Sequence, residues 1–278
     1  MGKALSLATV VVLGTVASAA AADLLPPPPI PAPLDTSGWY IRADVGVGLD
    51  DSYSFRSSLL PTNPLGGPAP PIARVFTSMG DSAIIGFGFG YQYNNWFRAD
   101  ITAEYRTKAH YRAGVAYAAG CAVAFCLDTY NGHVSKVVAL ANGYVDLGTW
   151  YGVTPFIGAG VGVAGTKLAG FTDNGLGNGF ASDRVKTDFA WALHAGLGYT
   201  VTPNLKLEFS YRYLNTGAFT SNPILCEFIS GCFFEQHSWK TASHDFRVGM
   251  RWLLASGESY GPGPAFYAPP PGPLVRKY

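Results

Sequence analysis

Apolar and polar residues alternate along much of this chain, and the alternation is clearest between residues 189 and 213. One parity of 189–199 carries aromatic and aliphatic side chains, while the other carries Ala, Gly and His194. After a short turn, leucine and aromatic residues alternate with lysine, glutamate, serine and arginine over 205–213. A period of two is typical of β-strands, and two such runs joined by a tight turn predict a hairpin.

The same alternation recurs along the chain and predicts eight strands. Their expected ranges are 38–49, 81–92, 97–107, 134–147, 155–167, 189–199, 205–213 and 243–254. The connections between them are alternately long and short, the long ones being 50–79, 108–133, 168–186 and 214–241. An up-and-down barrel with both chain ends on one side has this alternation. We therefore predict an all-β fold, an eight-stranded antiparallel up-and-down transmembrane β-barrel with four long external loops.

Alternation alone does not say which face of the sheet points outward. A soluble ligand-binding barrel would turn the apolar face inward, whereas a membrane barrel turns it toward lipid. The charged face carries both signs in similar number, as a closed polar interior requires, because unpaired buried charge is costly. The face also carries Lys136 and many glycines. The predicted interior charged network comprises Arg42, Asp44, Arg98, Asp100, Glu104, Arg106, Asp146, Lys206, Glu208, Arg212, Asp245, Arg247 and Arg251.

Aromatic residues gather where the short turns and the strand ends beside them are expected. A membrane barrel places such residues at the interface between lipid and water. Together with the balanced charges, this favours the membrane barrel over the soluble one. The predicted aromatic girdle consists of Trp39, Tyr91, Trp96, Trp150, Tyr151, Tyr199 and Trp252.

Composition fits this interpretation. Charged residues make up 13% of the chain, hydrophobic residues 48% and aromatic residues 14%, and there are 34 glycines. A mean hydropathy of +0.15 is too low for a helical membrane protein. After residue 22, no apolar run is long enough to span a bilayer as a helix. The net charge of +1, without a basic stripe, gives no support for nucleic-acid binding.

The two ends of the chain differ in composition from the predicted barrel. Residues 1–22 have a short basic start, an apolar stretch and a run of small residues, which predicts a secretory signal peptide. Residues 23–37 are rich in proline and predict an extended periplasmic spacer. The barrel is expected over 38–254, followed by a Gly/Pro-rich tail over 255–278.

Several segments resemble a known family. The segments PFIGAGVGVA (155–164), FAWALHAGLGYTVTPNLKLEFSYRY (189–213) and HDFRVGMRW (244–252) resemble small outer-membrane β-barrel proteins of Gram-negative bacteria, the porin-family and surface-antigen branch common in alphaproteobacteria. The resemblance covers nearly the whole mature chain and implies an outer-membrane barrel without implying one activity. Members of the family usually end at the last strand with an aromatic residue, whereas here a tail follows Trp252.

Candidate chemistry outside the charged face is sparse. Four cysteines fall in two long connections, and for an exported chain local disulfides Cys121–Cys126 and Cys226–Cys232 are preferred among the three possible pairings. Residues 160–165 match GxGxxG, but small inward residues of a strand explain it better than a nucleotide site. His194 is expected to be a hydrogen-bonded interior histidine. His110, His133 and His237 lack a zinc-ligand spacing, and we expect no catalytic site, cofactor or metal.

Three functions remain open from the sequence. The leading hypothesis is a structural barrel and surface antigen that contributes to envelope integrity and surface contacts, with its lumen mostly plugged by ion pairs such as Arg98 or Arg106 with Asp146 or Glu208. The alternatives are a narrow diffusion pore, motivated by the inward glycines, and a surface binder of hemin or a host factor. The expected partners are outer-membrane lipid, lipopolysaccharide and, during biogenesis, the barrel assembly machinery. We expect a monomer with both termini in the periplasm.

Overall fold

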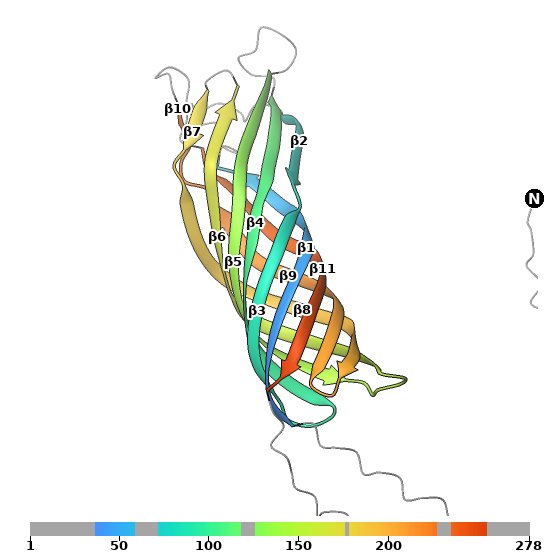
Figure 1. Cartoon of the computed structure of the whole chain (residues 1–278). Helices are drawn as coiled ribbons and strands as arrows, with labels where there is room; N and C mark the ends of the chain where they lie inside the picture. Colours follow the sequence, from blue (N-terminus) through green and yellow to red (C-terminus); the bar gives the residue numbers. More distant parts are fainter. Residues whose placement is uncertain (1–36, 59–71, 118–125, 176–177, 227–234, 255–278) are drawn as a thin grey trace, which may run out of the picture. The chain divides into compact units, whose positions relative to one another are not determined.

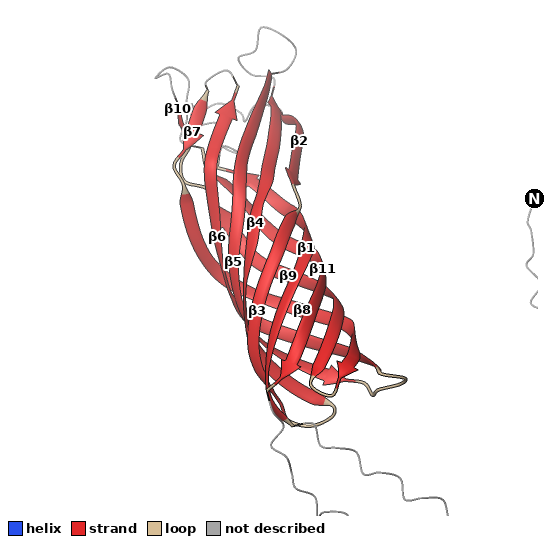
Figure 2. Ribbon diagram, in the orientation of Figure 1, coloured by secondary structure: helices blue, strands red, loops and turns tan. Residues whose placement is uncertain are grey.

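A computed structural model describes residues 37–58, 72–117, 126–175, 178–226 and 235–254. The predicted signal peptide, proline-rich spacer and C-terminal tail lie outside the described residues. The described elements are strands (Figure 2), and no helix in these ranges is long and apolar enough to cross a membrane. The strands are β1 (Gly38–Ser57), β2 (Ile72–Met79), β3 (Ser82–Gln92), β4 (Phe97–Tyr117), β5 (Cys126–Asp146), β6 (Val153–Asn174), β7 (Gly179–Ala181), β8 (Arg184–Thr202), β9 (Leu205–Thr220), β10 (Leu225–Cys226) and β11 (His237–Leu253).

Eight of these strands close into a ring. The order β6-β5-β4-β3-β1-β11-β9-β8 is continuous, and β6 also pairs with β8, so the sheet closes on itself. Neighbouring strands are antiparallel, and the first and last of the described strands, β1 and β11, are hydrogen-bonded neighbours (Figure 1). This arrangement confirms the predicted antiparallel up-and-down barrel. The short strands β2, β7 and β10 extend the sheet beside β4 and β6.

The short turns lie at one end of the barrel, the lower end in Figure 1, which we call the turn end. In the turn between β3 and β4, the side-chain oxygen of Asn94 accepts hydrogen bonds from the backbone N–H groups of Trp96 at 3.0 Å and Phe97 at 2.7 Å. Such side-chain bonding replaces missing backbone partners in tight turns. The opposite end, where β2, β7 and β10 lie, is called the loop end below.

The strands run further toward the loop end than the alternation predicted. The predicted third strand stops at 107, yet β4 continues to Tyr117, and β1 and β6 extend in the same way. Parts of all four predicted long loops are therefore β-sheet. Each strand that runs from the turn end to the loop end carries a bulge, in which two residues face one on the neighbouring strand. The bulges lie between Tyr53 and Arg56 on β1, Arg106 and Ala109 on β4, Ala169 and Thr172 on β6, and Asn215 and Ala218 on β9.

The inside and outside of the barrel exchange character near these bulges. On the turn-end side, charged residues are buried and apolar residues such as Phe87 and Ile101 are exposed. On the loop-end side, Lys108 and Arg112 are exposed on β4, while apolar side chains pack inward. This loop-end core contains Met79, Ala109, Tyr111, Ala113, Val115, Tyr130, Val134, Leu168, Phe171, Ala181, Phe219, Ile224 and Trp239. The barrel thus has a lipid-type half and a water-type half in one continuous sheet.

Candidate functional site

Buried charged side chains line the interior of the lipid-type half. All thirteen residues predicted for the interior network point inward; twelve are buried and Lys206 is half-buried. Together with two further buried groups, Asp50 and Lys136, they form a balanced set. The buried cations are Arg42, Arg98, Arg106, Lys136, Arg212, Arg247 and Arg251, and the buried carboxylates are Asp44, Asp50, Asp100, Glu104, Asp146, Glu208 and Asp245. Seven charges of each sign therefore face one another.

Asp245 on β11 is the centre of the densest part of this network. Its carboxylate accepts hydrogen bonds from Arg106 at 2.6 and 3.2 Å and from Arg212 at 2.6 and 2.8 Å. Arg212 also reaches Glu104 at 2.7 Å. Charge-assisted contacts of this kind are short and strong, and here they join β4 to the adjacent strands β9 and β11.

A second group of ion pairs lies nearer the turn end. Arg98 on β4 contacts Asp146 at 3.2 Å and Glu208 at 3.3 Å, and Arg251 contacts Glu208 at 3.0 Å. The Arg98 guanidinium lies over the ring of Tyr144, 4.2 Å from its centroid. Of the four ion pairs suggested by the sequence, the structure forms the two that involve Arg98. Arg106 pairs with Asp245 instead.

The inward glycines make room for these long side chains. A side chain at Gly86 would collide with Asp44, one at Gly88 would meet Arg42 and Thr102 at 2.8 Å, and one at Gly48 would collide with the guanidinium of Arg106. The space that each glycine leaves is therefore occupied by a neighbouring residue. This explains why glycines and arginines share one face of the sheet.

Asp50 is the interior charge that the strand prediction missed. It accepts a hydrogen bond from Lys136 at 2.8 Å and another from Ser82 at 2.5 Å. The predicted first strand ended at 49, although Asp50 continues the inward parity of Asp44. Extending the predicted strand by one residue would have placed Asp50 on the inward face. His194 is buried and lies 3.2 Å from the Asn142 amide oxygen.

A polar cluster is embedded in the loop-end core. The Glu235 carboxylate accepts hydrogen bonds from Tyr130 at 2.9 Å and from Ser57, and His237 lies 3.0 Å from it. Burial alone would raise the pKa of Glu235, but the hydrogen bonds from these partners outweigh it and hold that pKa below its ordinary value. Because Ser57, Tyr130 and Glu235 come from β1, β5 and the segment before β11, the cluster joins three separate loop-end segments. No feature of the sequence pattern indicated it.

A neighbouring carboxylate at the loop end behaves differently. Burial, followed by repulsion from Asp128 and Glu235, raises the pKa of Asp173 to about 7. The two histidines predicted to lack a zinc-ligand spacing, His110 and His133, are register partners on β4 and β5, with ring centroids 4.4 Å apart. His237 lies apart from them in the core described above.

The remaining predicted features fall as follows. The seven girdle aromatics lie at the turn end on the outer face or in the turns, where Trp39 stacks on Phe89 with ring centroids 4.8 Å apart. The GxGxxG segment lies within β6, paired on both sides with β5 and β8, so strand geometry accounts for its glycines. The side chains of the four cysteines lie outside the described residues.

These features define a class: a closed β-barrel with an apolar outer surface and an interior lined by buried, paired charges. The chain belongs to the outer membrane protein beta-barrel family, whose domain description matches residues 8–241. As a member of this family, it is a protein of the Gram-negative outer membrane.

Individual relatives agree with this assignment. An uncharacterized protein of Brucella abortus is 31% identical over 227 residues, covering 72% of this chain and 76% of the relative. The outer membrane protein PagN of Salmonella typhimurium is 27% identical, with coverage of 78% and 90%. A putative adhesin of Rickettsia typhi is 26% identical, with coverage of 77% and 87%. Among solved structures, the outer membrane protein OprG of Pseudomonas aeruginosa shares the fold, with a TM-score of 0.51 at 12% identity over 80% of this chain and 98% of OprG.

Proposed function

We propose that this protein is a structural, non-conducting barrel of the outer membrane that carries a rigid surface for contacts outside the cell. The observation that carries the proposal is the balanced set of seven buried cations and seven buried carboxylates inside the lipid-type half. Eight strands leave an interior that side chains can just fill. The protein would then act through its outer surfaces rather than through its lumen.

Two further observations support a closed lumen and argue against a diffusion pore. Two of the glycines that suggested a pore, Gly86 and Gly88, border Asp44 and Arg42, whose side chains occupy the space. Beyond the ion pairs, Trp239 and Tyr111 stack at 4.5 Å across the interior of the water-type half. An ion would have to break buried ion pairs and then cross an apolar layer, and both steps are costly.

Conductance in a planar bilayer tests the closed lumen directly. The mature protein, shown to be folded by its heat-modifiable gel mobility, is expected to give no reproducible current steps under conditions where a diffusion porin conducts. Reproducible small current steps would contradict the closed lumen and favour the narrow diffusion pore. Absorption during a hemin titration checks the remaining alternative, because bound hemin shifts its Soret band.

The contact role is supported by exposed apolar residues of the water-type half. Phe180 on β7 and Leu225 on β10 are register partners with exposed fractions of 53% and 44%. Exposed apolar side chains that adjoin one another often mark contact sites. Membership of a family that includes a putative adhesin agrees with attachment to another cell surface.

Replacing Phe180 and Leu225 by serine is therefore expected to lower attachment several-fold for bacteria that carry this protein as their only added surface protein. The loss follows from removing the apolar contact while the barrel itself is unchanged. Leu127→Ser is the matched control, because Leu127 is equally exposed at the loop end but lies on β5. Equal attachment by the double variant and the wild type, at equal surface display, would contradict the contact site.

We also propose that the turn end faces the periplasm. The described barrel begins at β1 and ends at β11 on this side, where the Leu254 N–H donates to the Trp39 carbonyl at 2.8 Å. Both chain ends would then leave into the periplasm, while the water-type half would stand outside the cell among lipopolysaccharide. Assembly as a monomer, through the barrel assembly machinery, is consistent with a ring that one chain closes by itself.

A further inference from the structure

One inward cation has no partner in the balanced network. Lys206 on β9 is half-buried and shares the inward parity of Glu208 and Arg212. The seven buried cations and seven buried carboxylates already match, so Lys206 is an eighth positive charge. Among the described residues, its amine forms no ion pair and no hydrogen bond.

The surroundings of Lys206 are positively charged. Its register partner across the β9–β11 pair is Arg251, and like charges opposite each other in a sheet are destabilising. The carboxylates of this region are engaged by arginines: Glu208 pairs with Arg42, Arg98 and Arg251, and Asp146 pairs with Arg98 and Arg251. A negative charge is therefore missing from this part of the barrel.

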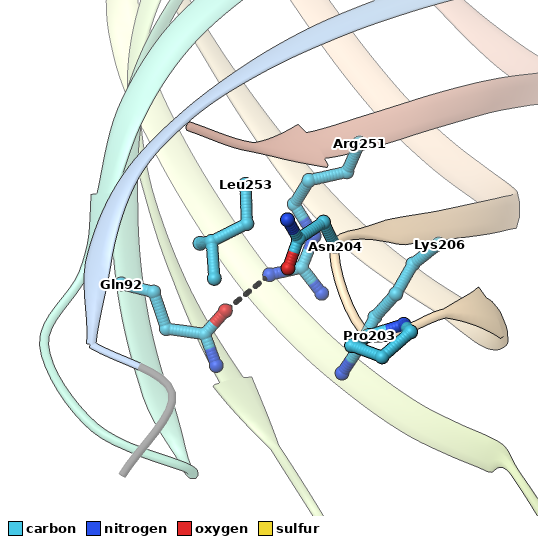
Figure 3. A pocket seen from close by; sticks show the side chains of 6 residues that line it. All are labelled: Gln92, Pro203, Asn204, Lys206, Arg251 and Leu253. Atoms are coloured by element: carbon cyan, nitrogen blue, oxygen red, sulfur yellow. Dashed lines mark hydrogen bonds between the residues drawn. The ribbon is translucent and has the colours of Figure 1, made fainter. Parts of the chain in front are cut away.

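A small pocket lies at the same place. It lies near the turn between β8 and β9 and is lined by Gln92, Pro203, Asn204, Lys206, Arg251 and Leu253 (Figure 3). Arg251 donates a hydrogen bond to the Gln92 side-chain oxygen at 2.7 Å, which fixes its guanidinium at the wall. Lys206 reaches the pocket from the neighbouring strand without such a bond, as Figure 3 shows. Its ammonium and the Asn204 amide supply donors, while Pro203 and Leu253 supply apolar walls.

We propose that this pocket binds a phosphate group, held by the Lys206 ammonium with Arg251 and Asn204 beside it. A phosphate oxyanion supplies the missing negative charge and accepts hydrogen bonds from a compact ammonium and a planar guanidinium. The phosphate comes either free in solution or as part of a phospholipid headgroup at the turn-end leaflet. This site is independent of the closed lumen and of the contact surface, because it needs neither of them.

The test measures thermal unfolding of the full mature chain in a detergent with a sugar headgroup, titrated with inorganic phosphate at constant ionic strength against chloride. The unfolding midpoint is expected to rise and saturate, because a ligand that binds only the folded state stabilises it by mass action. Lys206→Gln is expected to lose this rise. Without phosphate, the same variant should unfold at the wild-type temperature or higher, because it removes a repulsion from Arg251. Lys240→Gln, an exposed lysine on β11 outside the pocket, should keep the full rise.

Two results would overturn the proposal. An equal phosphate response in the wild type and Lys206→Gln would show a general salt effect rather than a site. A lower midpoint of Lys206→Gln without phosphate would show that the lysine has a structural partner. A second arm repeats the titration in nanodiscs of phosphatidylglycerol. If lipid headgroups fill the pocket, added phosphate no longer raises the wild-type midpoint there and Lys206→Gln unfolds below the wild type; if only free phosphate fits, the detergent result is repeated.

Discussion

Replacement of Asp245 by alanine is expected to lower the free energy of unfolding by about 3–5 kcal/mol, since removing one partner of a buried ion pair leaves charge uncompensated. Asp245 is fully buried and accepts hydrogen bonds from both Arg106 and Arg212. The alanine variant would leave Arg212 with Glu104 alone and Arg106 with only the longer contacts to Glu104 and Asp50, so that the buried positive charge is no longer balanced. Reversible urea unfolding in lipid vesicles, followed by tryptophan fluorescence, measures the change.

The matched control is Asp183→Ala, which breaks an ion pair on the surface. The Lys167 and Asp183 side chains are 50% and 53% exposed and lie 3.2 Å apart. Solvent screens such pairs, so this variant should unfold almost like the wild type. A double variant, Asp245→Ala with Arg106→Ala, should recover part of the lost stability because the charges balance again. Equal losses from the buried and the exposed variants would refute the role assigned to the interior network.

Replacement of Trp239 by alanine is expected to cost about 3–5 kcal/mol, the usual range for truncating a buried aromatic residue. Trp239 is 1% exposed and packs between Tyr111 and Phe219 in the loop-end core. The loss should be local, because the described core and the interior ion pairs have no residue in common. Hydrogen exchange should therefore become faster over 109–115 and 237–241, while protection over 38–48 remains.

Trp150→Ala provides the control for this variant. Trp150 is 58% exposed in the turn between β5 and β6, at the opposite end of the barrel from the loop-end core. Its truncation should leave exchange in the core unchanged. Faster exchange throughout the barrel of Trp239→Ala would mean that the two halves unfold as one unit, contrary to the division described here.

The sequence predicted the ring of strands from the period of two and the alternating lengths of the connections. It predicted the inward face from the balanced charges on one parity and from the aromatic residues near the turns. It did not predict how far the strands run, and the bulges explain why. On β4, Arg106 and Ala109 both point inward although three positions separate them, so the alternation changes parity at the bulge. A search for a continuous period of two ends there, at residue 107. The alternation changes parity in the same way at the bulges that contain Gly170 on β6 and Gly217 on β9, both of which have positive φ. The residues beyond these bulges were therefore predicted to be loops although they are strands.

The sequence also could not predict which charged residues of the network pair with one another. Parity places Arg106 and Glu208 inside the barrel, but the stagger between distant strands decides which groups meet. Arg106 meets Asp245 and Asp50, while Glu208 lies with Arg98. The inward glycines were ambiguous for a similar reason. Whether the space beside a glycine is open or occupied depends on the side chains of other strands, which the sequence does not place.

The loop-end core also limits the order in which the protein can be assembled. Its members come from β2, β4, β5, β6, β7, β9 and β11, so it draws on almost the whole length of the chain. If the loop end lies outside the cell, polar faces such as that of Lys108 and Arg112 must cross the bilayer before this core can form. The segments must then cross as unpacked hairpins, and the core can close only after β11 has arrived. Trp239 should therefore become buried slowly, in a late step of membrane insertion. A loop-end segment that packed before crossing the bilayer would stay on the periplasmic side.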